Sequence, residues 1–189
     1  MHFYLIIILS YILGSIPFGK IVGYFKGVDI QKQGSGNIGF ANSLRVMGWK
    51  PALVVLLGDM LKGYIPVFYA FDKFSLAQTT IIGLAAVAGH IFSPWLKFRG
   101  GKGVATMLGV SLALNPLIAL IAIVVWTIIF LLDKTASVSS LIIAMLMPIL
   151  SLFLEPNLIY FYLLLLIIIL FTHSANISNL IKGKEAKIL

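Results

Sequence analysis

The sequence is organised around one polar stretch between two strongly apolar segments, KFRGGKGVAT (residues 97–106). Glycine fills three of the four positions 100–103, so the backbone can turn its N–H groups inward and let a ligand approach closely. Positive charge is added by Lys97, Arg99 and Lys102. Val104 begins a run without charge that lasts until Asp133, so we expect a membrane helix to start there. The dipole of that helix would also favour an anion at its N-terminus.

This stretch is therefore predicted to be an anion-binding loop, and the candidate residues in it are Gly100, Gly101, Lys102, Gly103 and Thr106. The alternative is a basic turn at the membrane surface. Such a turn requires positive charge but does not require the glycines.

Composition indicates a polytopic membrane protein. Of the 189 residues, 60% are hydrophobic and only 11% are charged, whereas a soluble domain carries about a quarter charged residues. The formal net charge of +8 suits anionic lipid headgroups, with or without anionic substrates. The chain has no Cys, which excludes disulfides and thiolate nucleophiles, and its three His residues are far apart in sequence. We therefore expect neither a metal site nor a cofactor.

Outward from the loop, the apolar segments predict a single all-α membrane domain over residues 1–189, with the N-terminus outside and the C-terminus inside. Seven spans are expected, at residues 3–18, 52–71, 75–92, 104–115, 117–132, 137–154 and 157–173. With this topology, all of the 14 Lys and Arg residues except Lys62 and Lys73 lie on the inner side, as the positive-inside rule requires. The span at 104–115 is short for the roughly 20 residues of a full crossing.

A second glycine-rich segment, GSGNIGFAN (residues 34–42), lies in the first inner loop. It matches the dinucleotide pattern G-x-G-x-x-G, but that pattern requires a preceding strand, and the chain offers none here. The segment can still supply hydrogen-bond donors to a phosphate oxyanion. The candidate donors are Ser35, Gly36, Asn37 and Asn42, and Arg45 could hold a phosphate bidentately. The alternative is a Gly/Asn-rich turn before a surface helix.

Further polar residues lie within or beside the spans. Asp59 and Lys62 are three residues apart on one helix face, which favours a structural ion pair over support of a site. His90 is either an interfacial anchor or an acid, base or phosphate ligand. Ser137 lies among hydroxyls that also suit helix caps. Near the C-terminus, His173 and Asn176 are one helical turn apart and are expected to join the inner site.

Three segments, in chain order, resemble signatures of the bacterial acyl-phosphate-dependent glycerol-3-phosphate acyltransferases. They are GSGNIG (34–39) ending at Asn42, GHIF (89–92) followed by FRGGKGVAT (98–106), and HSANI (173–177). The resemblance covers nearly the whole chain. Departures from the family pattern are Ala41, the Ser93-Pro94 order, Arg99 and Asn179, of which Asn179 removes an expected cation.

The resemblance implies a seven-span enzyme of the bacterial inner membrane with its active site on the cytoplasmic face. It would transfer an acyl chain from acyl phosphate to the 1-hydroxyl of glycerol 3-phosphate, the first step of phospholipid synthesis, with lysophosphatidic acid and inorganic phosphate as products. Lys102 and His90 would be catalytic, and the other candidates would bind substrate. Membrane lipid is an expected partner and nucleic acid is not.

The chain lacks the H-x-x-x-x-D pair of thioester-dependent acyltransferases, since Trp95 and Ser178 stand at that spacing after His90 and His173. With no Cys either, we expect direct attack by the glycerol hydroxyl without an acyl-enzyme. The proton would pass to a substrate phosphate oxygen or to His90. The alternatives are a small transporter of a phosphorylated solute, which would be expected to show internal repeats, and a non-catalytic anchor protein, which would leave residues 100–103 unexplained.

Overall fold

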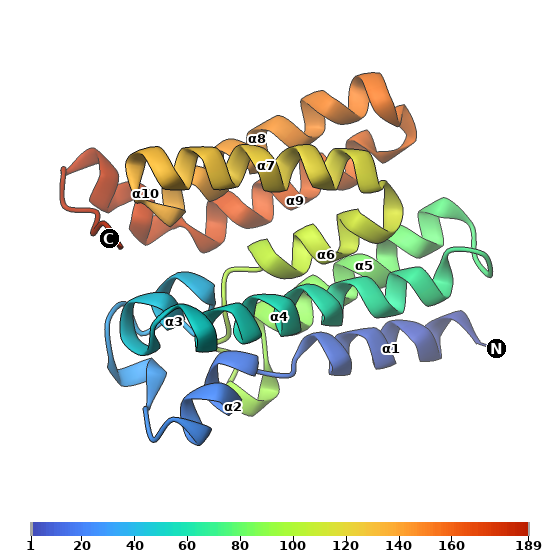
Figure 1. Ribbon diagram of the computed structural model, residues 1–189. Helices are drawn as coiled ribbons and strands as arrows, with labels where there is room; N and C mark the ends of the chain where they lie inside the picture. The colour runs from blue at the N-terminus through green and yellow to red at the C-terminus, as the bar shows by residue number, and fades with distance from the viewer. Residues whose placement is uncertain (1, 189) are drawn as a thin grey trace. The chain divides into compact units, whose positions relative to one another are not determined.

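The computed structural model describes residues 2–188, which form helices and connecting loops without any strand (Figure 1). The α-helices are α1 (Phe3–Gly14), α2 (Phe18–Phe25), α3 (Phe40–Met47), α4 (Trp49–Ala70), α5 (Leu76–Ile91), α6 (Val104–Leu114), α7 (Pro116–Asp133), α8 (Ala136–Leu154), α9 (Ile159–Thr172) and α10 (Ser174–Ile181). Short 3-10 turns are η1 (Ile30–Lys32), η2 (Pro94–Leu96) and η3 (Pro156–Leu158). The helices divide into two compact units, Met1–Leu114 and Asn115–Leu189.

Five helical segments of the described chain are long and apolar enough to cross a membrane. They are Phe3–Phe25, Trp49–Ala70, Leu76–Leu96, Pro116–Asp133 and Ala136–Leu154. A sixth candidate is the pair Pro156–Thr172 and Ser174–Ile181, which is bent by 64°. Each of the seven predicted spans contains a helix, but α6 has only 11 residues and does not qualify by length. The multi-pass, all-α prediction is confirmed, and the count of seven stays a prediction.

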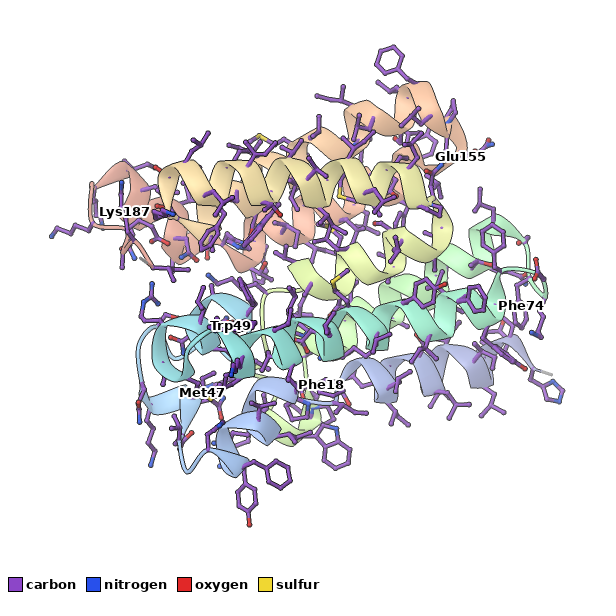
Figure 2. All side chains as sticks on the ribbon, viewed as in Figure 1. Phe18, Met47, Trp49, Phe74, Glu155 and Lys187 are labelled. Atoms are coloured by element: carbon purple, nitrogen blue, oxygen red, sulfur yellow. The ribbon has the colours of Figure 1, made fainter. Side chains whose placement is uncertain are left out.

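Helix α4 has its polar residues inside and its apolar residues outside. Leu53, Leu57 and Leu61 repeat every four residues and are 40–51% exposed, whereas Asp59 and Lys62 are almost fully buried. Figure 2 shows side chains projecting outward along the length of the helices. A soluble helix would show the opposite arrangement, so the outer face of α4 is suited to lipid.

Small residues allow the helices of the first unit to approach closely, as in other membrane bundles. A Cβ on Gly14 of α1 would overlap the backbone of Ala86 in α5. A Cβ on Gly63 of α4 would likewise overlap the backbone of Thr106 in α6. Short as it is, α6 is thus packed directly against α4, and this fixes where the preceding loop ends.

The second unit contains α7, α8, α9 and α10, with α8 packed against both α7 and α9. Trp126 of α7 donates from Nε1 to Oγ of Ser140 in α8 at 3.1 Å. The C-terminal tail returns to the α7–α8 connection, where the N–H of Ile188 donates to the carbonyl of Lys134 at 2.9 Å. The tail therefore lies beside the N-terminus of α8 (Figure 1).

Candidate functional site

The loop at residues 97–106 is fixed by main-chain hydrogen bonds to the end of α5. The N–H of Gly100 donates to the carbonyl of Ile91 at 2.9 Å, and that of Gly101 to the carbonyl of His90 at 3.0 Å. A Cβ on Gly100 would overlap the backbone of His90, and one on Gly101 would overlap the His90 ring. These two glycines are needed for close packing, and their N–H groups are already used within the protein. This corrects the expectation that both N–H groups turn toward a ligand.

The N-terminus of α6 provides the donors that remain in this loop. Helix α6 begins at Val104 as predicted, and the N–H of Met107 donates to the carbonyl of Gly103 at 2.8 Å. Helix geometry leaves the N–H groups ahead of Met107 without an acceptor inside the helix, and the helix dipole makes that end positive. Half-buried Lys102 stands just before it, and Gly103, with φ of +90°, forms the turn between them. Thr106 is fully buried, so its side chain belongs to the packing rather than to the open side of the loop.

The loop before α3 takes its shape from one buried side chain, that of Asn42. Its Oδ1 accepts from the N–H of Ser35 at 2.9 Å. Its Nδ2 donates to the carbonyls of Ile30, Gln33 and Asn37 at 2.9–3.1 Å. Gly34 and Gly36 both have positive φ, which suits glycine at these turns. Asn42 therefore organises the loop around itself.

The other predicted residues of this segment lie nearer the surface. Ser35 is exposed, and Gly36 and Asn37 are half-buried. Oδ1 of Asn37 accepts from the N–H of Gly39 at 2.9 Å, just ahead of α3. Arg45 is half-buried in the last turn of α3. Ser35 and Arg45 are therefore the groups of this segment best placed to contact a soluble ligand.

An apolar cluster brings the two glycine-rich loops to the same end of the first unit. Ile30 and Ile38, from the loop before α3, pack with Leu96 of η2, which leads into residues 97–106. Met47, labelled in Figure 2, packs against the same cluster from the end of α3. The two loops therefore pack together within this unit, and their common position on the inner membrane face stays a prediction.

Beneath the loop at 97–106 lie three buried ionisable side chains. Nζ of Lys62 is 2.8 Å from Oδ1 of Asp59, which confirms the predicted ion pair. Nδ1 of His90 lies 3.5 Å from the same oxygen. Lys62 also donates to the carbonyl of Ile16 at 2.8 Å, at the break between α1 and α2. His90 is only 3% exposed, so it is part of this cluster rather than an open interfacial anchor.

In the second unit, one carboxylate joins two predicted site residues. Oε1 of Glu185 accepts hydrogen bonds from Oγ of Ser137 at 2.7 Å and from Nδ2 of Asn176 at 2.6 Å. Sequence reasoning proposed Ser137 and Asn176 but assigned no role to Glu185. Glu185 could have been noticed in the sequence, because it is an acidic residue in a tail whose other charged side chains are all lysines.

His173 is buried at the junction of α9 and α10. Its Nδ1 lies 2.9 Å from the carbonyl of Ile169, and a carbonyl only accepts, so Nδ1 carries the proton. In the neutral ring, Nε2 is then an acceptor. The candidates therefore form one group in the first unit, at the two loops, and a second group in the other unit around Glu185 and His173.

Comparison with known proteins identifies the family. The family described as "Glycerol-3-phosphate acyltransferase" matches residues 4–183. The chain belongs to the glycerol-3-phosphate acyltransferase family. The resemblance inferred from the three sequence segments is thus confirmed.

Named members of this family match the chain from end to end. A glycerol-3-phosphate acyltransferase of Fusobacterium nucleatum is 41% identical over 99% of this chain and 98% of its own. One from Wolbachia pipientis subsp. Culex pipiens is 41% identical over the whole of both chains. One from Aquifex aeolicus is 39% identical over 95% of this chain and 96% of its own.

The fold also matches a solved member of the family. The crystal structure of PlsY, an integral membrane glycerol 3-phosphate acyltransferase in its glycerol 3-phosphate form, has a TM-score of 0.93 and 35% identity. The match covers 98% of this chain and 94% of that one. The lysophosphatidic acid form of the same enzyme gives a TM-score of 0.91.

Proposed function

We propose that this protein transfers an acyl chain from acyl phosphate to the 1-hydroxyl of glycerol 3-phosphate, releasing lysophosphatidic acid and inorganic phosphate. The observation that carries the proposal is membership of the glycerol-3-phosphate acyltransferase family over residues 4–183. The match to a solved family enzyme in a glycerol 3-phosphate form supports the acceptor. The donor assignment rests on the resemblance of the three signature segments and on the absence of Cys.

Both substrates carry a phosphate, and the loop end of the first unit offers groups that suit phosphate. Lys102 and the first turn of α6 supply a positive charge and backbone donors side by side. Ser35 lies in the other loop and Arg45 in α3, which follows that loop. In this proposal Lys102 neutralises phosphate charge that develops in the transition state, and Arg45 holds a substrate phosphate bidentately. Ser137, His173 and Asn176 stay proposed substrate-binding residues.

The reaction needs alignment more than a strong nucleophile, because acyl phosphate is already activated. The oxygen of the 1-hydroxyl attacks the acyl carbonyl carbon and forms the ester bond. The bond from that carbon to the bridging phosphate oxygen breaks, and the phosphate leaves with the electron pair. The hydroxyl proton goes to a phosphate oxygen, which balances the reaction. Burial of His90 beneath the loop favours this route over proton transfer to the imidazole.

The acyl chain is proposed to remain in the lipid phase during the reaction. At about 0.8 kcal/mol per buried methylene, a long chain is strongly held by the bilayer. Apolar side chains exposed along α4, such as Leu57 and Leu61, suit such lipid contact. The enzyme then needs to bring only the polar end of the donor to the loops.

We also propose that the protein lies in the bacterial inner membrane with both loops on the cytoplasmic face. Since the chain contains no Cys, single cysteines placed at Gln31, Lys97 or Lys187 report topology without background. In intact cells these three should be protected from a membrane-impermeant thiol reagent, and a cysteine at Lys73 should react. Labelling of the Lys97 and Lys187 positions on opposite sides of the membrane would contradict the proposed topology.

Donor choice is the sharpest test of the proposed reaction. The purified protein in bilayers should form lysophosphatidic acid from glycerol 3-phosphate and a long-chain acyl phosphate, and acyl-CoA should not replace the donor. Equal rates with acyl-CoA would overturn the donor assignment. Uptake of glycerol 3-phosphate into vesicles without ester formation would overturn the enzyme assignment in favour of transport.

A further inference from the structure

The buried polar cluster, defined as Asp59, Lys62 and His90, has no part in the reaction as proposed above. All three side chains are at most 3% exposed. Charged groups inside membrane spans are costly, so a cluster of this kind usually has a function beyond packing. The cluster lies directly beneath the loop at residues 97–106, where the His90 ring meets Gly101.

A continuous series of contacts connects this cluster to the loop. Lys62 donates to the carbonyl of Ile16 and lies 2.8 Å from Oδ1 of Asp59, so the carboxylate is anchored at the α1–α2 break. The same oxygen faces Nδ1 of His90 at 3.5 Å. On its opposite edge, Nε2 of His90 lies against Gly101, where a Cβ would overlap it.

His90 also holds Gly101 through its own backbone, because its carbonyl accepts the N–H of Gly101 at 3.0 Å. The ring and the carbonyl of His90 together therefore fix the position of Gly101, the residue just before Lys102. An ion pair serving only to neutralise charge would need Asp59 and Lys62 and nothing more. The third contact, from the carboxylate to the ring, is the one that relates the pair to the loop.

We propose that the buried polar cluster positions the loop at 97–106 for phosphate, with Asp59 as the positioning residue and His90 as the part that touches the loop. The identity of the ligand as glycerol 3-phosphate rests on the proposed function. The cluster itself does not contact substrate. Its effect is to hold Lys102 and the N-terminus of α6 in a binding arrangement before the ligand arrives.

The first test compares Asp59→Asn with a matched control, Ser10→Ala. Ser10 is also buried in the first unit, where its Oγ donates to the carbonyl of Ile82 at 2.7 Å, away from the loop. Asp59→Asn should raise KM for glycerol 3-phosphate about tenfold, the value typical of losing one interaction with a charged group. Its kcat should stay within about twofold, since the chemical groups remain. Ser10→Ala should leave both constants near wild type.

A second readout does not depend on activity. Amide hydrogen exchange of residues 97–106 should become faster in Asp59→Asn and stay unchanged in Ser10→Ala, while exchange in residues 29–39 stays the same in both. If the wild-type protein makes no lysophosphatidic acid, the proposed function fails, and this exchange comparison still decides the positioning role. Unchanged exchange and unchanged KM in a folded Asp59→Asn protein would overturn it.

A double variant, Asp59→Asn with Lys62→Met, covers the case in which the single change unfolds the protein by leaving a buried ammonium without its counter-ion. Removing both charges should restore thermal stability, because a neutral pair of similar size can replace a buried ion pair. KM and loop exchange should stay raised, since His90 has still lost its carboxylate partner. Recovery of stability together with wild-type KM and exchange would show a purely structural pair and contradict the proposal.

Discussion

The two glycine-rich loops of the first unit look alike in sequence but are held in different ways. The loop before α3 is organised by the side-chain amide of Asn42, which lies in the first turn of that helix, and its glycines at 34 and 36 are required by positive φ. The loop at 97–106 is held from below, by carbonyls at the end of α5 and by the ring of His90. Glycine at 100 and 101 is required there by lack of space.

The same signature of glycines and donors thus arises from two physical causes. A loop shaped by one amide should lose its conformation when that amide is replaced, and it should tolerate small substitutions elsewhere. A loop packed on a buried side chain should be sensitive to added volume at the contact. The variants below separate these two behaviours.

The largest effect is expected for Lys102→Ala. Loss of a cation that stabilises developing phosphate charge should lower kcat/KM by about 100- to 1000-fold, the range typical of removing one such group. Folding should change little, because the side chain is only half-buried. The measurement is acyl transfer beside thermal unfolding, with Lys26→Ala as the control for an exposed lysine elsewhere. If the variant is folded and keeps near-full turnover, Lys102 is not part of the active site.

Gly101→Ala should have the next largest effect. The added methyl meets the His90 ring, so the loop must shift, and displacement by about 1 Å at a site can cost roughly 100-fold in activity. Gly39→Ala is the matched control, since φ at Gly39 is −81° and a Cβ there would meet only Oδ1 of Asn37 at 3.1 Å. In steady-state kinetics, Gly101→Ala should lose much of its activity and Gly39→Ala should stay close to the wild type. Equal activity would mean that packing beneath the loop does not matter.

Asn42→Asp tests the other kind of loop. The change keeps the acceptor for Ser35 and removes the amide donor to three carbonyls, which should destabilise the protein by about 2 kcal/mol. Thermal unfolding measures the loss, and hydrogen exchange should increase in residues 29–39 and not in 97–106. Asn179→Asp, an exposed amide in α10, is the control. Faster exchange in both loops would show that they are not held independently.

The sequence predicted the helical segments and the start of α6 well, because long apolar runs and a glycine before Val104 are local signals. It also predicted the pair of Asp59 and Lys62, which share one helix face. It did not predict that Gly100 and Gly101 give their N–H groups to the end of α5, because that depends on how α5 and the loop pack. Nor did it assign Glu185 to Ser137 and Asn176, since 48 residues separate Ser137 from that carboxylate.

The smallest effect is expected from Asp29 at the start of the loop before α3. Lys20 donates to its Oδ1 at 2.7 Å and holds the pKa of Asp29 below its ordinary value. The folded state therefore binds fewer protons than the unfolded state, so this stabilisation is present at neutral pH. It is lost as pH falls through the lowered pKa, below about 4. The thermal stability of Asp29→Asn should match that of the wild type in acid and be slightly lower at about pH 7. A difference that grows in acid would contradict the assignment.

Release of inorganic phosphate from a long-chain acyl phosphate, measured with and without glycerol 3-phosphate, tests the central claim most directly. Direct transfer between two aligned substrates predicts no release and no acylated protein when the acceptor is withheld. With the acceptor present, one phosphate should appear for each lysophosphatidic acid, with sequential kinetics. A burst of phosphate without acceptor, together with an acyl group trapped on the protein, would contradict the account.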